Sequence, residues 1–450
     1  MKKFLLAVFL ISNVISSQEI INDTLQTTRQ DLDEVIVKGI RAKFSSPISF
    51  TNVDKQDLKS KNLGQDLPIL LNFLPSVVTT SDAGAGIGYT GIRIRGVSPQ
   101  STNITINGIP FNDPESMGTF WVNLPDFSSS IESLQVQRGV GTSTNGSGAF
   151  GASINILTDI VSDQPYAELS SSFGSYNTLK NTIKFSTGKI NDYFELSGRL
   201  SKIDSDGYVD RAYSDLKSYF IQGAYTNGST LIKAISFGGH EKTYQAWDGL
   251  SMDQVLENRR QNPLTYENEI DNYKQDHFQL HWNEKINNYW SFNLGLNYTD
   301  GRGYFEQYKE DDDINTYGGI VKSDIDSNGN ETGTTDLIRR RWLDNDFYVL
   351  NSSINYIKDK IDLTLSSSYS SYVGDHYGEV IWARSLSNTG EIRDRYYEGL
   401  GEKKDLSFFT KLLYSIDEKN SKLLLNKKLN DKVERLICSS FPDKKKIAKV

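Results

Sequence analysis

The stretch YWSFNLGLNY, residues 289–298, alternates strictly between large apolar side chains and small or polar ones. Successive side chains of a β-strand point to opposite faces of a sheet, so this stretch predicts a strand with one apolar and one polar face. The apolar face carries Trp290, Phe292, Leu294, Leu296 and Tyr298, and the polar face carries Ser291, Asn293, Gly295 and Asn297. The same alternation recurs in YFELSGRLS (193–201) and IDLTLSSS (361–368).

A soluble β-sandwich also alternates, so three further features decide the interpretation. The polar faces hold Asn, Ser, Gly and Glu, which pack a core poorly. Aromatic pairs such as Tyr289-Trp290 stand at strand ends, as in the interfacial girdles of membrane barrels. The connections alternate between short turns (187–192, 226–230, 283–288 and 357–361) and long loops at roughly 239–275 and 300–342. Together they predict an antiparallel transmembrane β-barrel over 163–415, with about ten strands.

Residues 416–450 differ from everything before them. Lysines are frequent, the alternation is lost, and the segment holds Cys438, the only cysteine. We interpret it as a basic tail from out-of-frame or replaced coding sequence, the alternative being an amphipathic helix with a basic end. No strand is therefore expected after residue 415.

The N-terminus predicts an exported protein. Two lysines precede an apolar run over 4–15 and a pair of serines, which is the order of a secretory signal peptide over 1–17. An uncleaved anchor or core helix is the alternative. A polar, flexible lead follows over 18–39. Its end, DEVIVKG (33–39), either adds as a strand to a partner's sheet or forms the first edge strand of the next domain.

Residues 40–162 predict a separate α+β domain. A short helix is expected over 66–73, with Pro68 near its first turn. Strands are expected at 91–95, 103–107, 133–138 and 152–157. In the first of these strands, Arg93 and Arg95 are two residues apart and so point to the same face. An exposed strand face is the simple explanation for Arg93, whereas a paired role is favoured for Arg95.

Composition excludes several function classes. A net charge of −8 and a pI of about 5.3 give no basic surface for nucleic acid. One cysteine and four scattered histidines exclude a disulfide framework and a Cys/His zinc cluster. No arrangement of nucleophile and base is found, so we expect neither an enzyme nor a cofactor.

One loop resembles a calcium site in its spacing. Asp324, Asp326 and Asn328 occupy positions one, three and five of a calcium loop, but position twelve falls on Thr335, where a glutamate is required. An ordinary Asn-Gly turn is the favoured interpretation.

Several motifs, in consistent order, resemble those of the TonB-dependent outer-membrane receptors of Gram-negative bacteria. The matching stretches are DLDEVIVKG (31–39), LLNFLPSV (70–77), IRIRGV (92–97), NITINGIPFNDP (103–114) and IESLQVQRGVGTSTNGSGAFGASINILT (131–158). FWVNLPDF (120–127) and EKTYQAWDG (241–249) look most like the iron-complex branch found in Bacteroidetes. The resemblance covers roughly 35–415 and implies a plug domain inside a 22-stranded barrel, so that 416–450 falls outside the family pattern.

The resemblance also implies functional residues. The TonB box, which a periplasmic energy transducer binds, falls on Asp33, Glu34, Val35, Ile36 and Val37. A plug–barrel lock, formed with glutamates of the later barrel half, falls on Arg95 and Arg138. Aromatic and apical loop residues are candidates for ligand contact, namely Met117, Phe120, Trp121, Tyr244 and Trp247. Arg339, Arg340 and Arg341 either attract an anionic chelate or form a solvated basic rim.

The function implied is energy-coupled uptake of a ferric siderophore or similar iron complex, with TonB, the chelate and outer-membrane lipid as partners. Two alternatives remain: import of another nutrient such as cobalamin, heme or a glycan, or a surface binding or adhesion protein without energy coupling. Because the predicted barrel stops at about ten of 22 strands, we expect a truncated and non-functional product.

Overall fold

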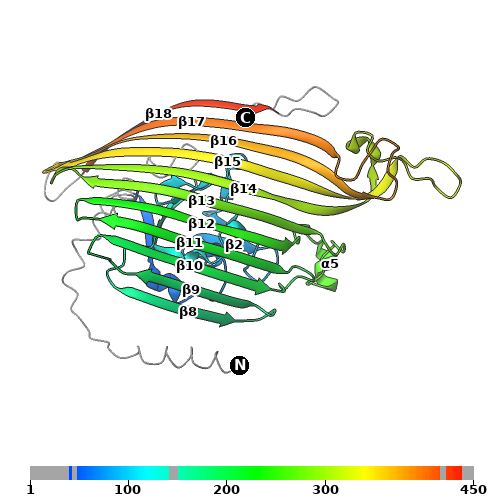
Figure 1. Ribbon diagram of the computed structural model, residues 1–450, viewed down its shortest axis with the longest axis horizontal. Helices are drawn as coiled ribbons and strands as arrows, with labels where there is room; N and C mark the ends of the chain where they lie inside the picture. Colours follow the sequence, from blue (N-terminus) through cyan, green and yellow to red (C-terminus); the bar gives the residue numbers. More distant parts are fainter. Residues whose placement is uncertain (1–39, 43–47, 141–149, 416–421, 438–450) are drawn as a thin grey trace.

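The computed structural model describes residues 40–42, 48–140, 150–415 and 422–437. The predicted signal peptide (1–17) and TonB box (33–37) lie outside these residues. Two parts are described, a small domain of short strands and a large curved sheet that covers it (Figure 1).

The small domain, which we call the plug, contains a five-stranded sheet and a separate hairpin. The sheet has the order β1 (Ser49–Asp54), β6 (Ile131–Arg138), β7 (Ala152–Thr158), β4 (Thr102–Ile106) and β5 (Ile109–Pro110). β4 and β7 run parallel, whereas the other neighbours are antiparallel. The hairpin pairs β2 (Val77–Ser81) with β3 (Thr90–Ile94). All four strands predicted in this domain are confirmed.

Short helices complete the plug. They are α3 (Lys55–Lys59), α4 (Leu67–Leu70) and the 3-10 turns η1 (Pro99–Ser101), η2 (Trp121–Asn123) and η3 (Phe127–Ser130). α4 confirms the predicted helix, although it is shorter than 66–73, and Pro68 lies in its first turn, where no intrahelical N–H is needed. Arg93 is exposed between the buried Ile92 and Ile94, so β3 alternates as the sequence predicts.

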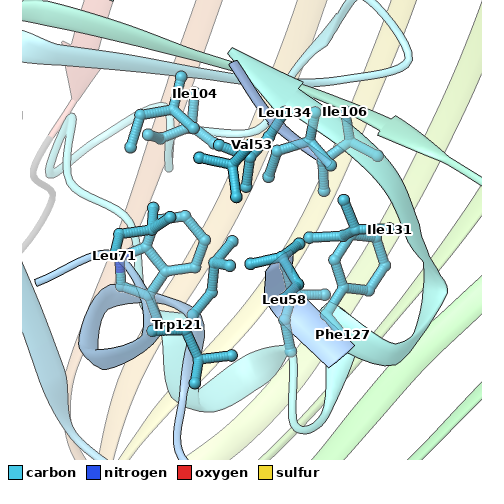
Figure 2. Packing of buried hydrophobic residues seen from close by; sticks show 14 of the residues in the cluster. Val53, Leu58, Leu71, Ile104, Ile106, Trp121, Phe127, Ile131 and Leu134 are labelled. Carbon is cyan, nitrogen blue, oxygen red and sulfur yellow. The ribbon is translucent and has the colours of Figure 1, made fainter. Parts of the chain in front are cut away.

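The apolar core lies between the plug sheet and its helices. Figure 2 shows Val53, Ile104, Ile106 and Leu134 of the sheet above Leu58, Leu71 and Trp121. The same cluster continues into the covering sheet through Phe220, Ile235 and Phe237. The plug is therefore packed onto the large sheet by apolar contact as well as by polar pairs.

The large sheet, which we call the wall, is antiparallel, and its strands pair in sequence order from β8 to β18. They are β8 (Pro165–Phe173), β9 (Leu179–Thr187), β10 (Phe194–Ser205), β11 (Ser214–Thr226), β12 (Thr230–Tyr244), β13 (Ile270–Lys285), β14 (Trp290–Asp313), β15 (Thr334–Lys358), β16 (Ile361–Ala383), β17 (Arg395–Ser415) and β18 (Lys422–Ile437). Within the described residues β8 and β18 do not pair with each other. The long connections, including α5 (Met252–Glu257), gather at one end of the wall, at the right of Figure 1.

The wall strands bury their polar face. In β9, Lys180, Thr182 and Lys184 are buried, while Ile183 and Phe185 on the other face are exposed. β10 repeats this arrangement. A soluble protein would bury the apolar set, so the arrangement is that of a barrel strand, which turns its apolar side to lipid and its polar side to the lumen. Separately, no helix among the described residues is long and apolar enough to cross a bilayer.

Two expectations about the wall are wrong. The long loops are shorter than predicted, 245–269 and 314–333, because β12 to β15 continue pairing beyond the regularly alternating part. Residues 422–437 form β18, which pairs with β17 along its whole length, although no strand was expected after 415. Backbone pairing to a neighbouring edge needs no side-chain alternation, which explains why the pattern missed this strand.

Candidate ligand cavity and plug–wall interface

A cavity of about 300 Å³ lies where the plug meets the wall near the long-loop end. The plug contributes Tyr89, Phe120, Asn123 and the segment 110–114. The wall contributes side chains of β12 to β16, and Trp247 comes from the loop that follows β12. Because both parts form its walls, any movement of the plug changes the shape of this cavity.

Aromatic rings form much of the lining. The ring of Trp247 packs edge-on against Tyr89 at 5.3 Å and against Phe305 at 5.7 Å, measured between ring centroids. Phe111 of the plug lies 5.3 Å from the ring of His277 on β13. Such surfaces bind flat or apolar parts of a ligand and attract cations to the ring faces.

The charged part of the lining is acidic. The hydroxyl of Tyr89 donates to Asp271 on β13 in a short hydrogen bond and lies 3.5 Å from Glu241 Oε1 on β12. Burial and the two nearby carboxylates hold the pKa of Tyr89 well above its usual value, so the phenol stays protonated. Among the described residues that line the cavity, none is Lys or Arg.

The loop of the plug around Glu115, which we call the apical loop (113–118), is attached to β16 and β17. Glu115 Oε2 accepts hydrogen bonds from His376 Nε2 at 2.7 Å and Tyr372 at 3.0 Å. Lys403 Nζ donates to the carbonyl of Pro114 at 2.7 Å. Burial alone would raise the pKa of Glu115, but the hydrogen bond and charge of His376, with help from Tyr372 and Lys403, lower it. Sequence reasoning missed this attachment, because a lone loop glutamate carries no signal.

Asp126 is the centre of a buried ion cluster between plug and wall. Its carboxylate lies 2.7 Å from Lys180 Nζ and 3.4 Å from Arg199 Nη1, and all three side chains are at most 2% exposed. Burial alone would raise the pKa of Asp126, yet the charges of Arg199 and Lys180 outweigh burial and hold it well below its usual range. Buried ion pairs of opposite charge thus attach the plug to the wall at this point.

Asp159 forms a second cluster of the same kind. Its carboxylate oxygens lie 2.6 Å from Lys184 Nζ of β9 and 2.8 Å from Lys55 Nζ of the plug. Sequence reasoning missed both clusters. A signal was available, since Lys180, Lys184 and Arg199 occupy inward positions of alternating strands, where a cation needs an anionic partner.

The comparisons with known proteins agree with this arrangement. A family model described as the TonB-dependent receptor plug domain matches residues 42–153, the segment that forms most of the plug. In structure, the ferric-catecholate import receptor Fiu of Escherichia coli K12 superposes with a TM-score of 0.64 at 13% identity, over 86% of this chain and 56% of Fiu. The siderophore receptor PirA of Acinetobacter baumannii gives 0.57 at 16% identity, over 92% of this chain and 58% of PirA.

Residues 42–153 therefore form the plug domain of a TonB-dependent receptor.

Sequence relatives of the chain are distant. The vitamin B12 transporter BtuB of Vibrio vulnificus is 28% identical over 214 residues, which is 46% of this chain and 33% of BtuB. A probable TonB-dependent siderophore receptor, PirA of A. baumannii, is 26% identical over 165 residues, or 34% of this chain and 22% of PirA. The chain therefore matches no more than a third of the length of these curated relatives. The matched proteins named here are transporters and receptors, not enzymes.

The five predicted ligand residues lie in different environments. Phe120 and Trp247 both line the cavity. Met117 is exposed on the apical loop, where its sulfur lies 3.2 Å from Lys403 Nζ. Trp121 is 3% exposed in the plug core, and Tyr244 is 4% exposed, with its hydroxyl within hydrogen-bond distance of two loop carbonyls. The structure therefore brings two of the five together at the cavity; their ligand contacts stay predictions.

The predicted lock arginines both lie on the plug. Arg95 follows β3 with a left-handed φ of 56°, and its guanidinium packs against Gly139. Arg138 ends β6, and its guanidinium lies 3.4 Å from Ser49 Oγ. Among the described residues, neither forms an ion pair with a wall strand. Their role as a plug–barrel lock stays a prediction.

The calcium-like loop uses its carboxylates for other contacts. Asp324 accepts from Thr335 and Ser385 and pairs with Arg384 Nη1 at 3.1 Å. Asp326 accepts from the backbone N–H groups of Asn328 and Asn330, as in an Asx turn. Within the described ranges, no group of three or more His, Cys, Asp or Glu side chains could hold a metal ion.

Proposed function

We propose that this chain has the architecture of an outer-membrane receptor that takes up a ferric siderophore or a similar iron complex; that it is a truncated and non-functional product stays a prediction. The observation that carries the proposal is the cavity of about 300 Å³, which plug and wall line jointly with aromatic and polar side chains. Cavities of this size and lining bind small molecules. Two structural neighbours, Fiu and PirA, carry names that refer to iron complexes.

In the proposed mechanism the ligand enters from the long-loop end and contacts plug and wall at once. TonB then binds the predicted box, Asp33 to Val37, and pulls on the plug from the other side. The polar contacts that release a path are those of the apical loop, because the clusters around Asp126 and Asp159 hold the opposite part of the plug more firmly. No covalent bond is made or broken.

Cobalamin uptake is the second candidate, favoured by one observation. The vitamin B12 transporter of V. vulnificus matches a longer stretch of this chain at a higher identity than the siderophore receptor relative does. Direct measurement of binding separates the two candidates.

Binding can be measured by tryptophan fluorescence, because Trp247 lines the cavity. The chain, purified in detergent, is titrated with ferric hydroxamate, ferric catecholate and cyanocobalamin. We expect saturable quenching by an iron complex that is lost in Trp247→Phe. Quenching by cyanocobalamin alone would replace the iron proposal with the second candidate.

Energy coupling needs a separate test. In cells that express the chain, deletion of residues 33–37 is expected to abolish uptake of the radioactive iron complex while leaving its binding to outer-membrane fractions intact. Equal uptake by the deletion variant and the intact chain would contradict the role of TonB.

A further inference from the structure

Two buried carboxylates at the cavity wall have no positive partner among the described residues. Glu241 is 1% exposed and Asp271 is 8% exposed, and both line the cavity. Their side-chain donors are Tyr89, whose single O–H donates to Asp271 and lies 3.5 Å from Glu241 Oε1, and Thr243, whose hydroxyl lies 3.0 Å from Glu241 Oε2. No lysine, arginine or histidine of the described residues forms an ion pair with either carboxylate.

This arrangement is costly without a further partner. A buried carboxylate needs a cation or several hydrogen-bond donors to offset the loss of hydration. One phenol, one threonine hydroxyl and the backbone N–H of Asn272 still leave lone pairs of Glu241 and Asp271 unused. The plug carboxylates Asp126 and Asp159, which are buried to the same degree, each have two cations within 3.4 Å. Glu241 and Asp271 therefore differ from the two carboxylates that attach the plug to the wall.

A second observation points to the same cavity. His277 is 4% exposed and lines it, and its Nδ1 is hydrogen-bonded to Thr299 Oγ1 at 2.8 Å. Its Nε2 has no hydrogen-bond partner among the described residues. Whichever tautomer is present, a cavity-lining residue thus carries a buried polar atom without a protein partner among the described residues.

The predicted basic rim does not supply positive charge to the cavity. Arg340 pairs with Glu306 at 2.8 Å and stacks on Tyr304 at 4.2 Å. Arg339 donates to Gln307 at 3.1 Å, and Arg341 donates to Tyr397 at 3.1 Å. These arginines bind residues of neighbouring strands, and none of them lines the cavity. The sequence-based expectation that they attract an anionic chelate has no support from this lining.

We propose that the cavity selects iron complexes that carry a protonated amine, which is bound between Glu241 and Asp271 with the rings of Tyr89 and Trp247 beside it. The amine supplies the missing cation, forms charge-assisted hydrogen bonds to both carboxylates and gains attraction from the ring faces. An anionic complex would meet the same carboxylates as like charges and would be rejected. This inference rests on the proposed uptake of an iron complex.

The test uses two ferric trihydroxamate complexes with one core. One ends in a free primary amine, and in the other the amine is acylated with succinate, so that the group changes from cation to anion. Both are titrated against the chain in detergent by tryptophan fluorescence. We expect the amine complex to bind about tenfold or more tightly than the succinylated one. Glu241→Gln and Asp271→Asn should each reduce this preference severalfold.

The control variant is Glu257→Gln, which removes the same charge from the exposed helix α5 outside the cavity and should leave the preference unchanged. Equal binding of both complexes, or tighter binding of the succinylated one, would overturn the inference and leave the uptake proposal intact. Binding of neither, with binding of cyanocobalamin, would overturn the uptake proposal itself. The comparison of the two complexes on the unaltered chain tests the inference even if a variant fails to fold.

Discussion

Two regions of the plug–wall interface treat buried acids in opposite ways. Around Asp126 and Asp159, the wall supplies Lys180, Lys184 and Arg199 at distances of 2.6 to 3.4 Å. At the cavity, the wall contributes the acids Glu241 and Asp271, and the plug side chain that hydrogen-bonds there is the phenol of Tyr89. In the first region each carboxylate is paired with cations of the protein itself. In the second region the carboxylates have no cationic partner among the described residues.

The difference separates attachment from recognition. A cluster whose charges are already paired leaves no charge for a ligand to bind. Separating plug from wall there is costly, because it leaves buried charges without partners. Unpaired acids at the cavity lower the stability of the fold, and they favour the binding of a ligand that carries a positive charge. The comparison therefore predicts large stability losses on the attached side and small losses or gains on the cavity side.

The largest effect is expected for Asp126→Asn. The substitution keeps the size of the side chain but leaves Lys180 and Arg199 buried without an anion, which typically costs about 3–5 kcal/mol. The free energy of unfolding of the chain in detergent, measured with urea, checks this. The matched control on β10 is Asp204→Asn, which breaks an exposed pair with Lys202 and should cost at most about 1 kcal/mol. Similar costs for the two variants would contradict a buried anchor.

Asp66→Asn tests an unpaired acid within the plug. Burial raises the pKa of Asp66 to about 8, against the hydrogen bond from Thr90, whereas its value in the unfolded chain is near 3.8. The folded state therefore retains a proton that the unfolded state loses. Stability from this group is complete below pH 4 and is lost as pH rises to about 8, by at most about 1.4 kcal/mol per pH unit.

Asp66→Asn should remove this loss, so that unfolding measured from pH 4 to 8 shows a flatter decline than in the unaltered chain. Asp57→Asn, an exposed substitution on α3, serves as control and should keep the original decline. An unchanged slope in Asp66→Asn would show that this carboxyl is ionised in the fold.

Glu115→Gln should have a smaller effect. It replaces the charge-assisted bond to His376 by a neutral one, at a cost of about 1–2 kcal/mol at pH 7. Because the pKa of Glu115 is lowered in the fold, its contribution is present above the unfolded value and is lost as pH falls through the folded value. The variant should therefore differ from the unaltered chain at pH 7 and converge with it in acid. A difference that grows in acid would contradict this assignment.

Sequence predicted the parts of the fold that depend on local pattern. The alternation at 289–298 reports the two environments of a strand directly, and β3, β4, β6 and β7 followed from short apolar runs. β18 has no such alternation, and the extensions of β14 and β15 follow from pairing with a neighbour, which a local window does not contain.

The candidate site was harder to predict for a related reason. Asp126 meets Arg199 across 73 residues, and Glu115 meets His376 across 261, so both pairs depend on strand register and on how the plug sits. Trp121 and Tyr244 were expected at a ligand surface because they lie in loops. The structure buries both, because large aromatic side chains in loops also gain free energy by packing. Phe120 and Trp247 line the cavity, and their contacts with a ligand stay predictions.

Strand length gives the wall an uneven height. β8 has 9 residues and β15 has 25, which at about 3.4 Å per residue correspond to roughly 30 Å and 85 Å along the strands. The apolar band of an outer-membrane barrel is about 25 Å tall, so β8 needs most of its length for the lipid, whereas much of β15 stands beyond it. On the cell surface the protein would form a slope rather than a rim. Antibodies or proteases from outside would reach β14 to β16 first, and the side of β8 to β10 would lie close to the lipid headgroups.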